Sequence, residues 1–258
     1  MRVGFVEWPE GLQPFGREWD KLAAQVEAAR LELLVTNELP FGPWIAQNQM
    51  FNRSIAQDSV AIHEVGSAAL ASLSIPAIIS SRPVWQGDRL ANEAFVLHGG
   101  AVNALHRKCY FPAEAGWFET AWYSPGKGEF RTQNVGNLRV GVLLCTDAMF
   151  NEHARSYGRQ GASLIAIPRA TGLSADMWLT AGKMAAIVSG SYVVSSNRVG
   201  ASADGPVFGG GGFAYRPDGS LVTTTASSNP LEIVHVEIEV ANRQQTAYPC
   251  YVAGADIY

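Results

Sequence analysis

The chain has 258 residues, of which 47% are hydrophobic and 16% are charged, a composition that excludes a disordered chain and a coiled coil. The formal net charge is −4 and like charges form no block, so the sequence predicts neither a nucleic-acid partner nor an anionic membrane partner but a small molecule. Compared with a domain of roughly 150 residues, this length favours one large domain over residues 1–258.

Short β-rich runs alternate with amphipathic stretches, which is typical of an α/β protein. The first strand is predicted over residues 3–8, a helix over 17–30 and a strand over 33–36. Asp58 is a plausible N-cap for a helix that runs to about residue 73, and a strand follows over 76–80. Further strands are predicted over 94–97 and 140–144.

The second half continues the alternation with a helix near 150–160, a strand over 163–167, a helix near 177–188 and a strand over 192–196. In the last third, the turn sequence at 217–220 separates strands over 213–215 and 221–224. The glycine-rich stretch at 209–212 precedes a strand rather than a helix, so it does not predict a phosphate-binding loop.

No apolar run approaches the roughly 20 residues that cross a bilayer, and the first residues are typical of a strand rather than of an export signal. The three cysteines, Cys109, Cys145 and Cys250, form no CxxC pair. The five histidines form no i, i+4 pair. We therefore expect a cytoplasmic protein with no metal site and with at least one free thiol.

Two apolar predicted strands end in reactive side chains. The strand at 33–36 runs into Glu38, and the strand at 140–144 runs into Cys145. Ligands of α/β sheets bind outside the carboxyl ends of strands. A cysteine before a helix has backbone N–H groups nearby that favour its thiolate, although a lone cysteine can also be a packing residue. Lys108 lies among aromatic residues, either in a solvated basic turn or in the same site.

Three segments together resemble the nitrilase, or carbon–nitrogen hydrolase, superfamily. Residues 36–41 are similar to its glutamate segment, 107–114 to its lysine segment with a second glutamate, and 141–147 to its nucleophile segment. The resemblance covers nearly the whole chain. The sequence departs from many amidases of the family at Thr146, where they carry tyrosine, and at Arg169, where a small residue is usual.

The resemblance implies a single-domain α-β-β-α sandwich, commonly assembled as a homodimer or larger homo-oligomer. It implies that Cys145 attacks an amide carbon, that Glu38 carries the protons, and that Lys108 with the backbone N–H of Thr146 holds the oxyanion. Glu114 is expected to keep Lys108 and the substrate oriented. Water then hydrolyses the thioester, and no cofactor is needed.

Aromatic residues close to these segments are candidates for the wall of a substrate pocket. Phe41 and Trp44 follow the glutamate segment, and Trp117 follows the lysine segment. The two other cysteines, Cys109 and Cys250, are expected to be inert.

Arg169 follows the predicted strand at 163–167 and leaves the sheet at the same edge as Glu38 and Cys145. Its guanidinium needs a planar acceptor partner. One alternative is an internal ion pair with Asp147 or Glu114 that braces the nucleophile loop. The other is a fork that binds a carboxylate or carbonyl of the substrate, which would favour an anionic or strongly polar amide.

The leading functional hypothesis is an amidase that releases ammonia or an amine from a small linear amide or carbamoyl compound. A nitrilase would attack a nitrile with the same residues and end at the acid. A catalytically silent binding or scaffold protein is the alternative from another class, and the presence of all three reactive side chains argues against it. An acyltransferase would need an acceptor channel that the sequence does not show.

Overall fold

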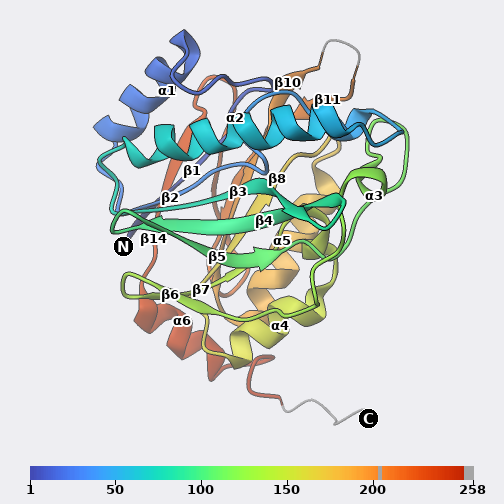
Figure 1. Ribbon diagram of the computed structural model, residues 1–258. Helices are drawn as coiled ribbons and strands as arrows, with labels where there is room; N and C mark the ends of the chain where they lie inside the picture. Colours follow the sequence, from blue (N-terminus) through green and yellow to red (C-terminus); the bar gives the residue numbers. More distant parts are fainter. Residues whose placement is uncertain (203–204, 253–258) are drawn as a thin grey trace.

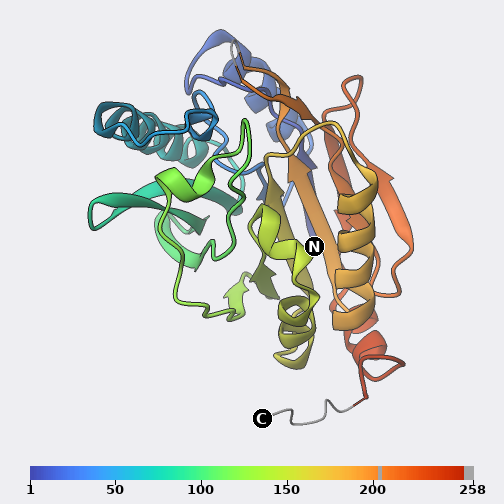
Figure 2. The ribbon, with the colours of Figure 1, turned by 90° about the vertical axis from the view of Figure 1, so that its right-hand side faces the viewer.

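Two six-stranded sheets lie face to face, with helices on both outer faces (Figures 1 and 2). The computed structural model describes residues 1–202 and 205–252. The first sheet has the order β14 (Leu231–His235), β1 (Arg2–Val6), β2 (Leu33–Val35), β3 (Ala77–Gln86), β4 (Arg89–His98), β5 (Ala101–Arg107). The second has the order β13 (Leu221–Thr224), β12 (Phe213–Tyr215), β9 (Tyr192–Asn197), β8 (Leu164–Arg169), β7 (Leu138–Val142), β6 (Gln133–Val135).

The helices form the two outer layers. Helices α1 (Arg17–Ala28) and α2 (Arg53–Ala71) pack on the first sheet, and α4 (Asn151–Arg159) and α5 (Asp176–Ser189) pack on the second. The short α3 (Glu119–Trp122) lies in the connection between β5 and β6, and α6 (Ile238–Gln245) packs against the core between the sheets. The predicted α-β-β-α sandwich is confirmed.

The alternation of side chains along the central strands explains why these strands are apolar throughout. In β8, Leu164 and Ala166 enter the core between the sheets, whereas Ile165 and Ile167 pack under α4 and α5. In β2, Leu33 and Val35 face the other sheet and Leu34 faces α1 and α2. Each such strand is covered on both faces, so period-two alternation places apolar residues in two different cores.

The strand directions bring the predicted reactive segments to one edge of the sandwich. Strand β2 is parallel to β3, and because β4 is antiparallel to both of its neighbours, β5 runs in the same direction as β2. Strands β7, β8 and β9 are likewise mutually parallel. The segments that follow β2, β5, β7 and β8 therefore all leave at carboxyl ends of strands, where ligands of α/β sheets bind.

Several element boundaries differ from the sequence-based prediction. The N-cap of α2 is Asn52 rather than Asp58, because the Asn52 side chain accepts hydrogen bonds from the backbone N–H groups of Ser54 and Ile55. Strands β3 and β4 each extend to ten residues as a long hairpin. Strand β5 was not predicted, since its first four residues are exposed and lack an apolar alternation.

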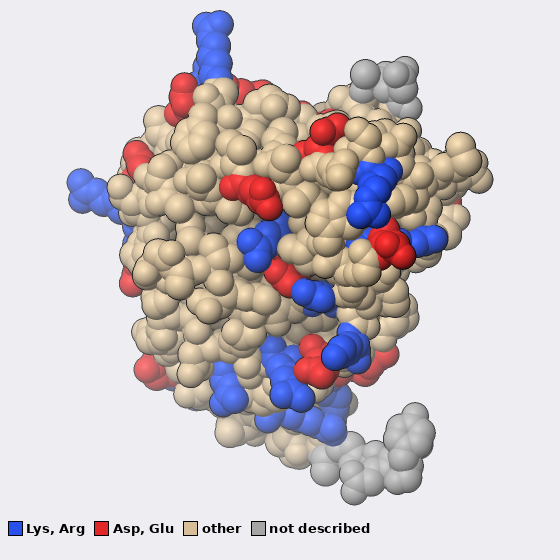
Figure 3. Space-filling view, viewed as in Figure 1, with Lys and Arg blue, Asp and Glu red and all other residues tan. Residues whose placement is uncertain are grey.

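A small sheet and two 3-10 helices complete the fold. Strands β10 (Val199–Ala201) and β11 (Val207–Gly209) pair with each other, and 3-10 helices occur at Ile45–Gln47 and Cys145–Met149. Basic and acidic side chains lie interspersed on the face shown in Figure 3. Within residues 1–202 and 205–252, no helix is long and apolar enough to cross a membrane.

Helices α4 and α5 approach closely at Gly158, and we expect Gly158→Ala to destabilise the protein. A Cβ at this position would lie 2.3 Å from the backbone oxygen of Ser189. Replacing a helical glycine with alanine normally stabilises by about 1 kcal/mol, but overpacking here should cost about 1 to 3 kcal/mol. Urea unfolding measures the change, with Arg159→Ala on the exposed side of α4 as the control. A Gly158→Ala variant more stable than the wild type would contradict the close helix contact.

Candidate active site

Lys108 is fully buried between two carboxylates. Its Nζ donates hydrogen bonds to Glu38 Oε1 at 2.9 Å and to Glu119 Oε2 at 2.6 Å. Burial alone would lower the pKa of Lys108, but the charges of Glu119 and Glu38 raise this pKa well above its usual value. The two carboxylates therefore favour the charged form of this buried lysine.

Glu38 follows β2 in a loop that several backbone contacts fix. Its N–H donates to the carbonyl of Arg169 in the other sheet at 3.1 Å, and Leu39 has a φ of 45°. Asn92 Nδ2 donates to Glu38 Oε1 at 2.8 Å, so this oxygen has two donors. The other oxygen, Oε2, is buried and has no hydrogen-bond partner among the described residues. One carboxylate oxygen of Glu38 is thus held by two hydrogen bonds, and the other is able to accept a further one.

Arg198 also contacts the loop after Glu38. Its guanidinium pairs with Glu10 and donates to the carbonyls of Leu39 and Gly42. The N–H of Leu39 donates to Ser81 Oγ at 2.8 Å. Because a non-glycine residue at positive φ is strained, these contacts are what keep the turn after Glu38 in place.

Cys145 begins the 3-10 helix that follows β7, at a φ of 49° and with only 3% of its surface exposed. Burial raises the pKa of its thiol well above the usual value; the charge of Glu38 raises it further, and the charge of Lys108 opposes this. Burial thus opposes the thiolate form that backbone N–H groups at this position are expected to favour.

Glu119, rather than Glu114, is the second glutamate at the lysine. Glu119 is buried at the first position of α3, whereas Glu114 is exposed. Burial raises the pKa of Glu119 to about 7, against the opposing charge of Lys108. The prediction that Glu114 orients Lys108 is wrong, because the chain turns back at Gly116 and brings the later glutamate inward.

Asp147 ties the lysine loop to the nucleophile loop. Its Oδ1 accepts from the N–H groups of Cys109 and Tyr110, each at 3.1 Å. Its Oδ2 accepts from the N–H of Leu144 at 3.3 Å and bonds to His106 Nε2 at 2.8 Å. This buried carboxylate fixes the segments on either side of Lys108 and Cys145 relative to each other.

A cavity of 380 Å³ opens at Cys145. Its lining residues are Pro112, Glu114, Trp117, Glu119, Cys145, Thr146, Met149, Ala170, Thr171, Gly172, Leu173, Ser174, Met177 and Trp178. Trp117, one of the predicted pocket residues, is among them.

The two other aromatic candidates do not line this cavity, so their predicted place in the wall is wrong. Trp44 lies behind Trp117, with ring centroids 5.6 Å apart. Phe41 belongs to the core under α2, where it packs against Gly66. The segment 170–178, which supplies much of the wall, has no reactive side chain that would have marked it in the sequence.

Arg169 takes neither of its predicted roles. Its three nitrogens donate to Ser195 Oγ at 2.6 Å, to Thr171 Oγ1 at 3.1 Å and to the Gly211 carbonyl at 2.9 Å. It also lies over the ring of Phe213, and burial lowers its pKa to about 10. The predicted ion pair is wrong, and so is the substrate fork, because Arg169 does not line the cavity.

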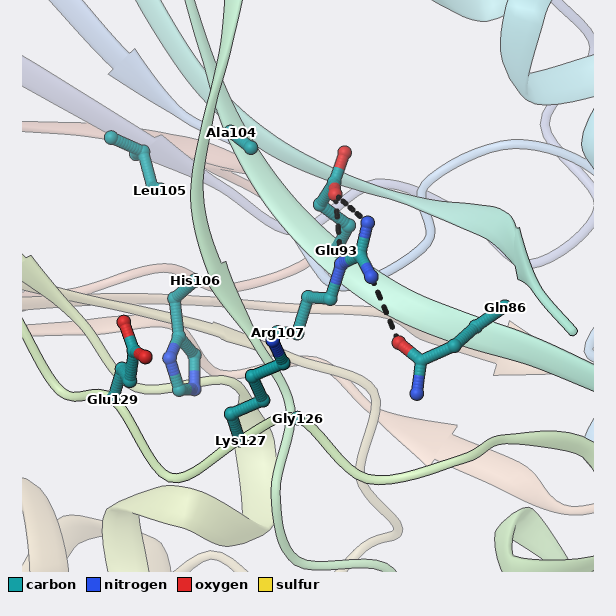
Figure 4. Close-up of a pocket in the computed structure, with 9 residues that line it drawn as sticks. All are labelled: Gln86, Glu93, Ala104, Leu105, His106, Arg107, Gly126, Lys127 and Glu129. Carbon is teal, nitrogen blue, oxygen red and sulfur yellow. Dashed lines mark hydrogen bonds and ion pairs between the residues drawn. The ribbon is translucent and has the colours of Figure 1, made fainter.

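A larger cavity of 620 Å³ lies beside β5 (Figure 4). Arg107 lines it and donates hydrogen bonds to Glu93 and Gln86, and Lys127 and Glu129 also belong to its lining (Figure 4). Its lining contains none of Glu38, Lys108 or Cys145, so the smaller cavity is the candidate active site. Among the described residues, no group of three or more His, Cys, Asp or Glu could hold a metal ion.

Known proteins resemble this chain in sequence and in fold. A model of the carbon–nitrogen hydrolase family matches residues 7–248. The chain is 26% identical to a citrullinase of Francisella tularensis over 58% of this chain and 56% of that protein. It is 30% identical to an N-carbamoylputrescine amidase of Solanum tuberosum over 39% of this chain and 36% of that protein. The matches thus span little more than half, or less, of these curated relatives.

Solved structures show the same fold along nearly the full chain. A carbon–nitrogen hydrolase from Helicobacter pylori has a TM-score of 0.84 at 19% identity, covering 97% of this chain and 94% of its own. An amidase from Nesterenkonia has a TM-score of 0.78 at 22% identity, covering 94% of this chain and 92% of its own.

We expect Asp147→Asn to weaken both stability and the site. The substitution removes a buried charge that accepts four hydrogen bonds, and breaking a buried pair typically costs about 3 to 5 kcal/mol. Urea unfolding measures the loss, and the rate of Cys145 alkylation shows whether the nucleophile loop has moved. Asp58→Asn, at an exposed position of α2, is the control and should change neither the unfolding free energy nor the alkylation rate. Unchanged unfolding and alkylation in Asp147→Asn would contradict its role in fixing the two loops.

Proposed function

Because the chain belongs to the carbon–nitrogen hydrolase family, we propose that it is an amidase that cleaves a small linear amide or carbamoyl compound and releases ammonia or an amine. The observation that carries this proposal is the buried group of Lys108, Glu38 and Glu119 beside the thiol of Cys145. Together these side chains offer a base, a fixed positive charge and a nucleophile.

The first half of the reaction forms a thioester. The free Oε2 of Glu38 accepts the thiol proton as Cys145 Sγ attacks the carbonyl carbon. Lys108 Nζ and the backbone N–H of Thr146 stabilise the oxyanion. Glu38 then passes its proton to the leaving nitrogen, the C–N bond breaks, and the amine departs. The acyl group stays on Sγ.

The second half returns the enzyme to its starting state. Glu38 takes a proton from a water molecule as the water oxygen attacks the thioester carbon. The C–S bond breaks, the carboxylic acid is released, and the proton held by Glu38 returns to Cys145. These steps need no cofactor, since the carboxylate and the lysine supply the proton transfer and the positive charge.

The raised pKa of the Cys145 thiol explains why this scheme needs a base. A thiol that stays protonated at neutral pH is a weak nucleophile, so its proton must be removed as the attack proceeds. Glu119 does not need to carry protons in this scheme; its hydrogen bond keeps Lys108 Nζ beside Glu38. The two glutamates therefore have different tasks.

The names of the relatives leave the acyl group open. They include a nitrilase of Pyrococcus abyssi, 32% identical over 48% of this chain, beside several amidases. Incubation with a panel of amides and nitriles, followed by product analysis, separates the amidase from the nitrilase. Release of ammonia or amine with acid from amides supports the proposal, and turnover of nitriles alone would contradict it. The homo-oligomer and the cytoplasmic location stay predictions.

Cys145→Ala should abolish turnover and leave the fold intact. Alanine keeps the Cβ at the same backbone conformation and removes only the sulfur. Because the thioester can no longer form, the rate should fall by at least about a thousandfold. Intact mass of the wild type with a slowly released amide should show an acyl adduct that is absent in Cys145→Ala. Cys109→Ala is the matched control and should retain both the adduct and the rate; loss of turnover in the control alone would contradict the assignment.

Glu38→Gln should slow alkylation of Cys145 by iodoacetamide at neutral pH by at least about tenfold, as expected for loss of a general base. The direction of the change in alkylation rate distinguishes a general base from a residue that acts only through its charge. The charge of Glu38 raises the pKa of the thiol, so a glutamate that acted only through its charge would give faster alkylation when neutralised. Mass spectrometry of the Cys145 peptide measures the rate, and the Cys250 peptide is the internal control. Faster alkylation in Glu38→Gln would contradict its role as the base.

A further inference from the structure

The charged residues that line the Cys145 cavity are both acidic. They are Glu114 and Glu119, and the lining contains no lysine, arginine or histidine. Glu119 is already paired with Lys108, which is fully buried, and each nitrogen of Arg169 donates to a protein acceptor. The residues that line the cavity therefore offer carboxylates, and no cation, to the tail of a substrate.

Glu114 is held at the exposed border of the cavity. Its carbonyl accepts a hydrogen bond from the N–H of Trp117 at 2.8 Å, which closes a tight turn through Gly116. Trp44 Nε1 donates to the Gly116 carbonyl at 3.1 Å and fixes this turn to the core. The Glu114 carboxylate itself forms no ion pair or hydrogen bond among the described residues. A carboxylate that is held on a fixed turn and has no partner within the described residues is suited to binding a cationic ligand.

The lining of the cavity is largely apolar. It includes buried Cys145 and exposed Glu114. Its larger hydrophobic side chains are those of Pro112, Trp117, Met149, Leu173, Met177 and Trp178. Such a wall can bury the methylene groups of a short chain. Trp117, whose backbone bonds to that of Glu114, belongs to the same lining, and indole rings can bind cations.

We propose that this cavity selects small linear amides whose tail ends in a positive charge, and that Glu114 and Trp117 recognise that charge. The preferred substrate is thus an amide or carbamoyl group joined by a short methylene chain to an ammonium or guanidinium group. This inference rests on the proposed amidase function. The expected preference for cationic substrates is opposite to the preference for anionic substrates that substrate binding by Arg169 would give.

Three amides of similar length test the charge preference: γ-aminobutyramide is cationic, valeramide is its neutral counterpart, and succinamate is anionic. For the wild type we expect kcat/KM to be about five- to tenfold higher for the cationic amide than for the neutral one, chiefly through KM, from one exposed charge pair and one cation–π contact. At about 1 M NaCl, where the Debye length is about 3 Å, this ratio should shrink.

Substitutions at Glu114 assign the preference to a residue. Glu114→Gln should bring the cationic-to-neutral ratio close to one, and Glu114→Lys should make succinamate better than γ-aminobutyramide. Glu129→Gln is the matched control, because it removes the same charge from an exposed glutamate at the other cavity (Figure 4). Its ratio should equal that of the wild type. Turnover with the same ratio in wild type and Glu114→Gln would overturn the inference while leaving the amidase function standing.

A second measurement does not depend on turnover. Aminoethyl, methyl and sulfonatoethyl methanethiosulfonates carry positive, zero and negative charge and modify thiols by disulfide formation with loss of a sulfinate. We expect Cys145 to react in the order cationic, neutral, anionic, with the order reversed in Glu114→Lys. If no amide or nitrile is hydrolysed but this order holds, the proposed function fails and the charge selection stands. An order that Glu114→Lys does not change would overturn the charge selection.

Discussion

The site depends on one lysine kept charged in the interior. Lys108 has no access to solvent, so the cost of removing its ammonium from water must be offset by Glu38 and Glu119. The three side chains come from the segment after β5, from the loop after β2 and from α3, so both ion pairs form only when all three segments are in place. Burial is the main reason why the pKa of Glu119 is raised to about 7; the charge of Lys108 opposes this rise, and the charge of Glu38 adds to it.

The loops at this edge are fixed by contacts that cross between sheets. The N–H of Glu38 bonds to the carbonyl of Arg169 in the second sheet, and Asp147 of the nucleophile loop bonds to the lysine loop. Leu39 and Cys145 both have positive φ, a conformation that costs free energy for a residue with a side chain. The surrounding hydrogen bonds hold the turns in which Glu38 and Cys145 lie.

The sequence was most informative where apolar strands end in polar residues. Glu38 and Cys145 could be predicted because a parallel strand covered on both faces has a recognisable pattern, and strand direction then brings its ends together. That Glu119 rather than Glu114 bonds to Lys108 could not be predicted from the sequence, because it depends on where the chain turns back at Gly116. The partners of Arg169 were missed for a related reason: Ser195 and Gly211 are neutral groups from other strands and loops, and no spacing marks them.

One electrostatic cause has two consequences at this site. The excess negative charge around Lys108 adds to burial in raising the pKa of the Cys145 thiol, which keeps the sulfur protonated until a base acts on it. On the charge selection that we propose, the same carboxylates would repel an anion that enters the cavity, and exposed Glu114 would add to that repulsion. The need for a base at Cys145 and the proposed preference for cations would then follow from the same arrangement: more carboxylates than cations around a fully buried lysine.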